Sequence, residues 1–205
     1  HRRVTVMVVN VAGFLPMLQR HTPAAAMHLL DELYATTSRV VHAHDGHVEK
    51  MLGDTVQCVW GINAARPDDE LRAVRAAVQL QHEIGVLSSA RKERGDEPFT
   101  VGIGVATGDA VIGTVGGAAR AETVVVGEVT AIATAVEQEA KVHGFGLLVS
   151  EETFRCAAAE YEGAATPPML VRGIGVPLTL YRVRPKRAAK DEQTEKRETT
   201  EPVRR

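Results

Sequence analysis

The sequence GHVEKMLGDTVQCVWG (residues 46–61) has two apolar runs on either side of a Leu-Gly-Asp turn. A glycine at such a turn lets the chain reverse between two paired strands, so the stretch predicts a β-hairpin. The turn presents the carboxylate of Asp54 at the edge of a sheet, where a hard cation could reach it. Lys50, four residues earlier, lies near the same turn.

The stretch before the hairpin predicts a strand and a helix. Residues 4–11 (VTVMVVNV) are nearly all β-branched, which is typical of a central strand covered on both faces. Thr22 and Pro23 have the character of a helix cap and a first helical residue, and the helix should end at Asp45-Gly46. The apolar residues at helical spacing that mark its expected inner face are Met27, Leu30, Tyr34 and Val41.

The stretch after the hairpin predicts a second helix, a second hairpin and a third helix. The acidic residues 68–70 open the second helix, as the helix dipole favours. Its residues expected to face inward are Leu71, Val74, Val78 and Ile84. Residues 99–107 and 110–115 should pair through a turn at Gly108-Asp109. A short buried strand at 123–126 then leads into a helix over 128–142.

The C-terminal part predicts three more strands and a charged tail. The strands are expected at 146–149, 169–172 and 178–183, with Ser150 capping a short helix after the first. Residues 184–205 contain eight Lys or Arg, five Asp or Glu and hardly any apolar side chain. We therefore expect one domain over residues 1–183 and a tail, 184–205, that is disordered in isolation.

The order of elements predicts an α+β fold. A β-α-β-β-α-β order with further strand pairs indicates a ferredoxin-like core with extra strands and helices on one face of the sheet. No apolar run approaches the roughly 18 residues that cross a bilayer, and there is no signal peptide, so we expect a cytoplasmic domain without membrane insertion. The chain begins without Met, which suggests a piece of a longer protein. A basic face with aromatics is missing, which argues against nucleic-acid binding.

Several smaller motifs have simpler interpretations than a functional site. The glycines at 102, 104 and 108 lack the spacing and the following helix of a dinucleotide site. His42, His44 and His47 could hold zinc, but histidines also favour a helix C-terminus. Glu49 and Glu128 are expected to be solvated or ion-paired rather than catalytic. Two cysteines are too few for a disulfide framework.

Four further stretches carry a family resemblance. They are VMVVNVAGF (6–14), VGIGVATGDAVIGTVGG (101–117), VGE (126–128), and LVRG followed by PLTLY (170–173 and 177–181). With the Lys-x-x-Gly-Asp of residues 50–54, they make the chain resemble the catalytic domain of class III adenylate and guanylate cyclases over nearly all of residues 3–183. The resemblance implies the class III nucleotidyl cyclase fold and a role in intracellular cyclic-nucleotide signalling.

The resemblance also implies a set of site residues. Active members cyclise ATP or GTP at a dimer interface, where two aspartates of one subunit hold two Mg²⁺ ions. Those positions fall on Asn10, which has no charge, and on Asp54. The lysine that reads the base comes from the other subunit and falls on Lys50. Its polar partner falls on Val124, which can neither donate nor accept a hydrogen bond.

The remaining catalytic positions are also altered. The Asn and Arg that steady the ribose and the transition state fall on Ala131 and Ala135. Arg172 could meet a phosphate or be a solvated strand-end arginine. We therefore expect a catalytically degenerate domain that binds Mg²⁺ weakly or not at all.

Three functions remain open at this point. The favoured one is a dimerising or nucleotide-sensing regulatory module, as a homodimer or with another cyclase-like domain, which buries the hairpin at 50–56 and could bind ATP or GTP. The second is an active adenylate cyclase, forming cyclic AMP and pyrophosphate, that compensates with Glu128 or Mn²⁺. The third is a structural interaction domain without a ligand.

Overall fold

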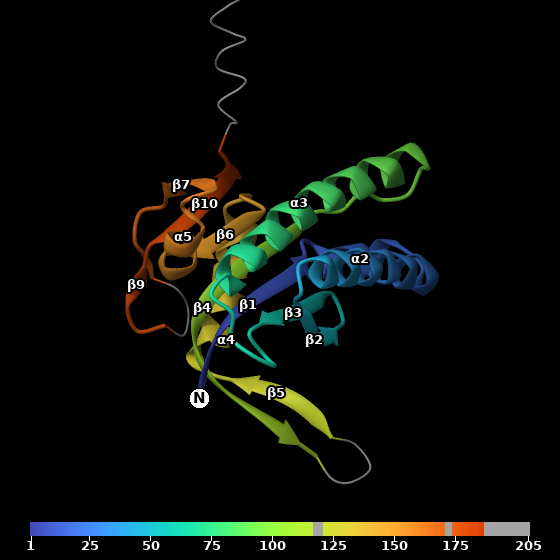
Figure 1. The fold of residues 1–205 in the computed structure, drawn as a ribbon. Helices are drawn as coiled ribbons and strands as arrows, with labels where there is room; N and C mark the ends of the chain where they lie inside the picture. The colour runs from blue at the N-terminus through green and yellow to red at the C-terminus, as the bar shows by residue number, and fades with distance from the viewer. Residues whose placement is uncertain (117–120, 171–173, 187–205) are drawn as a thin grey trace, which may run out of the picture.

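The computed structural model describes residues 1–116, 121–170 and 174–186. Its core is a βαββαβ unit (Figure 1) made of β1 (Arg2–Val11), α2 (Pro23–Ala43), β2 (His47–Leu52), β3 (Thr55–Trp60), α3 (Asp69–Glu93) and β4 (Val101–Val115). The strands lie in the order β2-β3-β1-β4, and every neighbouring pair is antiparallel. This is the strand order of a ferredoxin-like sheet, so the predicted α+β fold is confirmed.

Further elements extend this core on the β4 side. The sheet continues from β4 through β6 (Leu147–Ser150) and β10 (Leu180–Pro185) to β7 (Tyr161–Ala165). β6 is parallel to β4 and antiparallel to β10. The other added elements are α1 (Phe14–Arg20), β5 (Glu122–Val126), α4 (Glu128–Val142), α5 (Glu151–Ala157) and the small pair β8 (Met169–Leu170) and β9 (Pro177–Leu178). The sequence did not predict α1 or β7.

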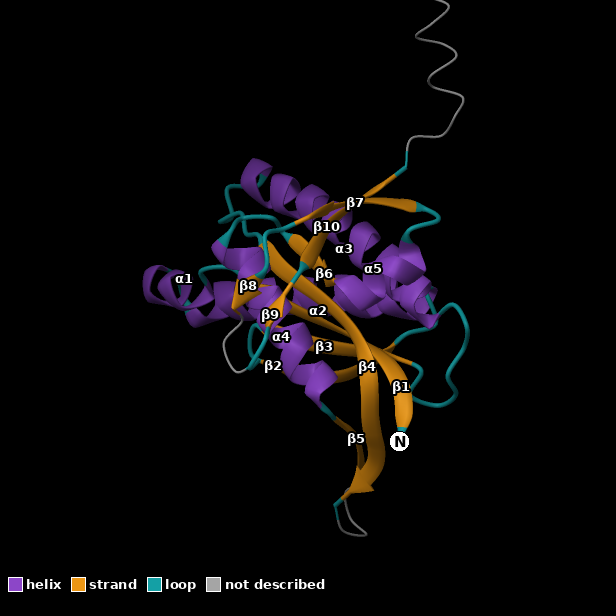
Figure 2. Ribbon diagram, turned by 90° about the vertical axis from the view of Figure 1, so that its left-hand side faces the viewer, coloured by secondary structure: helices purple, strands orange, loops and turns teal. Residues whose placement is uncertain are grey.

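Strand β1 is buried on both faces, as its composition predicted. Met7 and Val9 pack in the cluster that α2 and α3 cover, whereas Val6 and Val8 pack against α4. Figure 2 shows α4 on one side of β1 and β4, with α3 and α5 on the other. The expectation that the helices lie on one face is right for α2 and α3 and wrong for α4.

The predicted turn at Gly108-Asp109 is wrong. β4 runs unbroken through these residues, and its register with β1 extends from Val11↔Val101 to Arg2↔Ala110. Gly108 instead lets α4 pack closely on the strand, because a Cβ there would lie 3.3 Å from the Val129 side chain on α4.

The chain reverses after Val115 instead, and β5 pairs with the last residues of β4. Figure 1 shows the two strands projecting from the body of the domain as an arm. The strand expected at 123–126 is therefore present, but most of its residues are exposed rather than buried.

Helix α2 has the predicted ends and a different inner face. The Thr22 hydroxyl accepts a hydrogen bond from the Ala25 amide at 3.3 Å, which confirms the cap. Met27 is 65% exposed, although it was expected inside. The buried residues are Ala26, Leu29, Leu33, Thr37, Val40 and Val41, so the expectation is wrong for Met27 and confirmed for Val41. Apolar residues occupy two adjacent stripes of this helix, and the contact with α3 and the sheet determines which one is buried.

Two observations concern the limits of the domain. β10 continues to Pro185, and the tail from residue 187 lies outside the described residues. Within the part of the chain that the structure describes, no helix is both long enough and apolar enough to cross a bilayer.

Candidate functional site

The two positions expected to bind metal lie side by side at one end of β1. Asn10 pairs in register with Thr55, directly after the β2–β3 turn that carries Asp54. The Asn10 amide donates to the Asp54 carbonyl at 3.2 Å and to the Thr55 hydroxyl at 2.7 Å. The Val11 amide donates to the same carbonyl at 3.1 Å. The Asn10 side chain and the Val11 backbone thus fix the turn, while the Asp54 carboxylate makes no hydrogen bond within the described residues.

A lysine that the sequence analysis missed reaches this position from α4. Lys141 Nζ donates to Asn10 Oδ1 and lies 3.0 Å from Glu137 Oε1. Glu137 and Lys141 are four residues apart on the helix, a spacing that usually marks a solvated ion pair. Nothing in the local sequence therefore distinguishes this pair from a surface pair, and only the tertiary packing brings it to Asn10.

Two glycines of β4 make this contact with α4 possible. Gly102 lies opposite Asn10 in the sheet, and Gly104 lies opposite Val8. A Cβ at Gly102 would lie 2.4 Å from Lys141 Cγ, and one at Gly104 would lie 2.2 Å from the Glu137 backbone nitrogen. The helix can therefore rest directly on the strand only because both residues lack a side chain.

Burial and charge shift the pKa values of two groups around Asp54. Burial of Glu137, which is 3% exposed, raises the pKa of its carboxyl to about 7. Lys141 opposes this rise, and the negative charge of Asp54 adds to it. The Tyr34 hydroxyl donates to the Gly53 carbonyl, and burial followed by the charge of Asp54 raises the pKa of Tyr34. The charge of Asp54 thus raises the pKa of groups on two helices, Glu137 on α4 and Tyr34 on α2.

Glu49 lies between the two positions expected to read the base, because it contacts Lys50 and the backbone next to Val124. A register shift between Val48 and Lys50 marks a bulge in β2, which turns the Glu49 side chain inward. Glu49 accepts hydrogen bonds from the Gln57 side chain and, at 2.8 Å, from the Val125 amide. Its side chain is fully buried and lies 3.8 Å from Lys50 Nζ, so of the two expected alternatives Glu49 is ion-paired rather than solvated.

Glu49 therefore holds the β2–β3 hairpin against β5. Lys50 Nζ lies 3.8 Å from Glu49 Oε1 and its side chain is 53% exposed. Val124, next to Val125, adds only an apolar side chain. Glu128, at the start of α4, is exposed. This end of the site offers the ammonium group of Lys50, which is paired with Glu49, and no side chain at position 124 that could form a hydrogen bond with a base.

The two alanines of α4 face different surroundings. Ala131 is exposed, whereas Ala135 is 4% exposed and packs in one cluster with Ile174. Ile132, Met169 and Leu178 border the same cluster. Neither alanine can donate a hydrogen bond from its side chain, and Ala135 has an apolar cover. Arg172 lies outside the described residues.

The residues of the site do not fit a pair of metal ions. Magnesium is held by carboxylates together with phosphates, and here Asp54 supplies one carboxylate while the carboxyl group of Glu137 is paired with Lys141. The oxygen of Asn10 is already bonded to Lys141. Elsewhere in the described residues, no three His, Cys, Asp or Glu side chains gather as a metal site. His42 bonds the Ser38 carbonyl and His44 the Gln79 side chain, so the zinc hypothesis receives no support.

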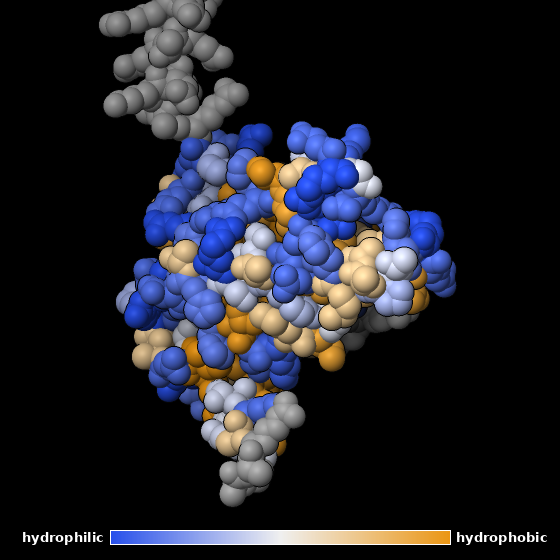
Figure 3. Space-filling view, turned by 90° about the vertical axis from the view of Figure 1, so that its right-hand side faces the viewer, coloured by the Kyte–Doolittle hydropathy of each residue, from blue (hydrophilic) through white to orange (hydrophobic). Residues whose placement is uncertain are grey.

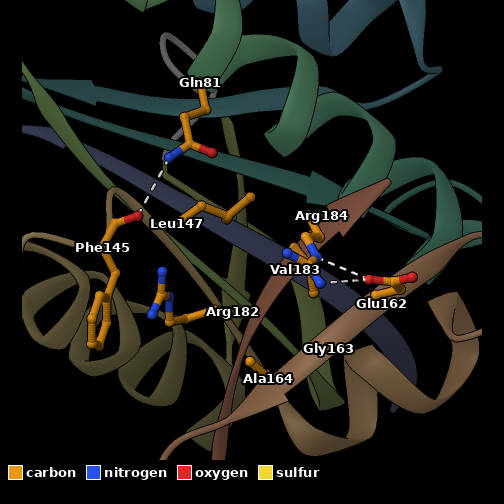
Figure 4. Close-up of a pocket in the computed structure, with 9 residues that line it drawn as sticks. All are labelled: Gln81, Phe145, Leu147, Glu162, Gly163, Ala164, Arg182, Val183 and Arg184. Carbon is orange, nitrogen blue, oxygen red and sulfur yellow. Dashed lines mark hydrogen bonds and ion pairs between the residues drawn. The ribbon is translucent and has the colours of Figure 1, made fainter. Parts of the chain in front are cut away.

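A separate hollow of about 460 Å³ lies between α3 and the strands β6, β7 and β10. Figure 4 shows Glu162 paired with Arg184, and Arg182 beside Phe145. The Arg182 guanidinium lies 4.6 Å from the Phe145 ring centre. None of the predicted site residues lines this hollow. Its charged groups already have partners, so it is not our candidate site.

Comparison with known proteins identifies a family. The model of the adenylate and guanylate cyclase catalytic domain matches residues 1–184. Adenylate cyclase 1 of Rhizobium meliloti (strain 1021) is 28% identical over 149 residues, which are 73% of this chain and 22% of that protein. The adenylate cyclase of Anabaena cylindrica is 25% identical over 160 residues, 75% of this chain and 30% of that protein. The chain thus spans less than a third of these relatives.

Solved structures show the same fold. The adenylyl cyclase CyaB from P. aeruginosa superposes with a TM-score of 0.82 at 21% identity, covering 91% of this chain and 95% of that one. The guanylate cyclase domain of RhGC from Catenaria anguillulae, in complex with GTP, gives 0.79 at 19% identity and covers 91% and 98%. The class III cyclase fold expected from the sequence is therefore confirmed.

Proposed function

Because this chain belongs to the family of adenylate and guanylate cyclase catalytic domains, we propose that it is a catalytically degenerate member. In this proposal it acts as a dimerising or nucleotide-sensing module of a cytosolic signalling protein. The observation that carries the proposal is the environment of Ala135. At the position where the resemblance implies an arginine, the structure has a buried methyl group packed with Ile174.

The size of the expected losses supports inactivity. An arginine acting on a transferring phosphoryl group is worth about 10³ to 10⁵ in rate. Removing one preorganised donor costs on the order of 10² to 10³. This chain lacks both side chains at Ala131 and Ala135 and one metal carboxylate at Asn10. Even with strong overlap between these effects, turnover falls below a useful level.

Exposed apolar side chains support the dimerising role. They gather on the β4–β5 arm and on the tip of the β2–β3 hairpin, at Val111, Val115, Val126, Met51 and Leu52. Figure 3 shows apolar surface at the base of the arm, on a face that is largely polar. A second copy, or another cyclase-like domain, would cover these side chains and bury the hairpin at 50–56.

The retained residues support nucleotide sensing. Lys50 keeps an exposed ammonium group, and Asp54 keeps a carboxylate without a hydrogen-bonding partner in the described part of the chain. In a dimer, Lys50 can contact the base of ATP or GTP, and Asp54 of the other subunit can hold the phosphates through at most one weakly bound Mg²⁺ or Mn²⁺ ion. The family neighbour from Catenaria anguillulae is in complex with GTP. Binding without turnover is the behaviour that this arrangement favours.

The second candidate is an active adenylate cyclase with non-standard residues. It is favoured by the likeness to two adenylate cyclases and by the retained Asp54. In that case Glu128, which is exposed beside the arm, or Mn²⁺ in place of Mg²⁺, would have to compensate for the missing groups.

A product assay tests the proposal. The 205-residue chain is incubated with ATP or GTP and either Mg²⁺ or Mn²⁺, and cyclic nucleotide is measured by mass spectrometry. The Asp54→Asn variant is the matched control, because it keeps the turn and removes the carboxylate. We expect no difference between the two proteins. Cyclic AMP or GMP formed by the natural chain and lost in Asp54→Asn would establish the active alternative.

A further inference from the structure

We propose that the ammonium group of Lys141 is a built-in cation that takes the place of a metal ion at Asn10. This inference rests on the proposed function only in treating Asn10 and Asp54 as the former metal positions. Lys141 Nζ donates to Asn10 Oδ1 and lies 3.0 Å from Glu137 Oε1. The ammonium group of Lys141 therefore already uses the oxygen of residue 10, which a divalent ion would need as a ligand.

The side chain of Lys141 is held in one position by its neighbours. Its stem crosses Gly102, where a Cβ would lie 2.4 Å from Lys141 Cγ. Its side chain is 27% exposed, against 53% for Lys50. Glu137, which anchors it, is almost fully buried on the same helix face. An ordered stem, one carboxylate and one amide oxygen define the position of the charge.

The substitution of an amide for a carboxylate fits this arrangement. An ammonium group needs only acceptor oxygens, and a neutral amide supplies one without adding a negative charge. Asp54 and Glu137 already bring two carboxyl groups to this region, and Asp54 raises the pKa of Glu137. Restoring a carboxylate at position 10 would give Lys141 a stronger ion-pair partner. The single substitution should therefore not restore a metal site.

Metal binding without turnover tests this inference. Binding of Mn²⁺ is measured by the electron paramagnetic resonance signal of free Mn²⁺ in the 205-residue chain. The variants are Asn10→Asp, Lys141→Met, and the two combined. We expect weak binding in the natural chain and in each single variant, and at least about tenfold tighter binding in the double variant. Adding Asp54→Asn to the double variant should remove the gain.

The opposite results would overturn the inference. Asn10→Asp alone binding Mn²⁺ as tightly as the double variant would show that Lys141 does not occupy the position. A double variant that binds no better than the natural chain would show the same. Circular dichroism confirms that each variant is folded before its binding is interpreted. The outcome is independent of the cyclase assay, so an active natural chain would refute the proposed function without affecting this test.

A second measurement uses the natural chain alone. Amine acetylation followed by peptide mass spectrometry compares Lys141 with Lys92, an exposed lysine of α3 outside the proposed interface, which serves as the internal control. We expect Lys141 to react at least several times more slowly than Lys92, and Asn10→Ala to accelerate Lys141 only. Equal rates in the natural chain would mean that the ammonium group is not held, and would overturn the inference even if the double variant fails to fold.

Discussion

Replacing Gly104 by alanine should be among the most damaging single-methyl changes in this domain. A Cβ at this position would lie 2.2 Å from the Glu137 nitrogen and 2.4 Å from the Ala133 carbonyl oxygen. Both are backbone atoms of α4, so no rotamer change can relieve the overlap. The helix must move away from β4, which loosens the packing of Val8 and Ala106 beneath it.

The expected loss can be set against a matched control on the same strand. Overpacking of a core typically costs about 1 to 3 kcal/mol, and a rigid backbone contact belongs at the upper end. Gly113 also lies in β4, but a Cβ there meets nothing within 4 Å. Gly113→Ala should be neutral or stabilise the domain by up to about 1 kcal/mol, because the unfolded chain loses freedom. The two variants should therefore differ by roughly 3 kcal/mol.

Urea unfolding followed by tryptophan fluorescence measures this difference. Trp60 is the single tryptophan of the chain and is fully buried, so its emission reports global unfolding. Equal m-values would show that both variants expose the same surface on unfolding, so that their midpoints compare stability directly. If Gly104→Ala unfolded at the same urea concentration as Gly113→Ala, the close approach of α4 to β4 would be refuted.

Three more outcomes follow from the structure. The pKa of Glu137, about 7, lies above the ordinary value of 4.5, so the folded chain binds more protons than the unfolded chain between these values. The free energy of unfolding of the natural chain, relative to that of Glu137→Gln, should fall by about 2 to 4 kcal/mol as pH rises from about 4.5 to about 7.5. Urea titrations of both proteins at several pH values measure this difference, and a difference that does not change with pH would contradict the raised pKa. Thr22→Ala should cost about 1 kcal/mol by the same method, because the Ala25 amide loses its cap, and Thr22→Ser should recover it. Ala135→Arg should lower the melting temperature without creating cyclase activity, because it places a charge in the Ile174 cluster, whereas a stable and active variant would show that this cover opens freely.

Local sequence patterns were sufficient for the core and for most helix ends. The cap at Thr22, the helix starting at Glu128 and the hairpin around Gly53 all depend on neighbouring residues, so they could be predicted. The turn at Gly108 could not be judged locally. Small residues recur at every second position of β4, at 102, 104, 106, 108 and 110, and this period of two is the signal of a strand face pressed against a helix.

The candidate site was predictable only in part for a related reason. The pairing of Asn10 with the Asp54 turn follows from adjacent strands, and the sequence resemblance identified both positions. The contact between Lys141 and Asn10 joins residues 131 positions apart. A Glu-Lys pair four residues apart on a helix carries no local sign of such a contact. The inward side chain of Glu49 was missed because a bulge changes the alternation of β2.

The way α4 meets its surroundings explains how the scaffold persists while its reactive positions differ. One stripe of the helix, with Ala133 and Glu137, rests on glycines of β4 and is fixed by backbone contact. Ala131 is exposed, so its identity has little effect on packing. Ala135 lies one turn further along the same face as Ala131, in the cluster with Ile174. Because this face is separate from the stripe that rests on the glycines, chemistry can be lost from it while the helix stays on the sheet. Because Ala135 packs against Ile174, however, an arginine placed at position 135 would have no room for its side chain.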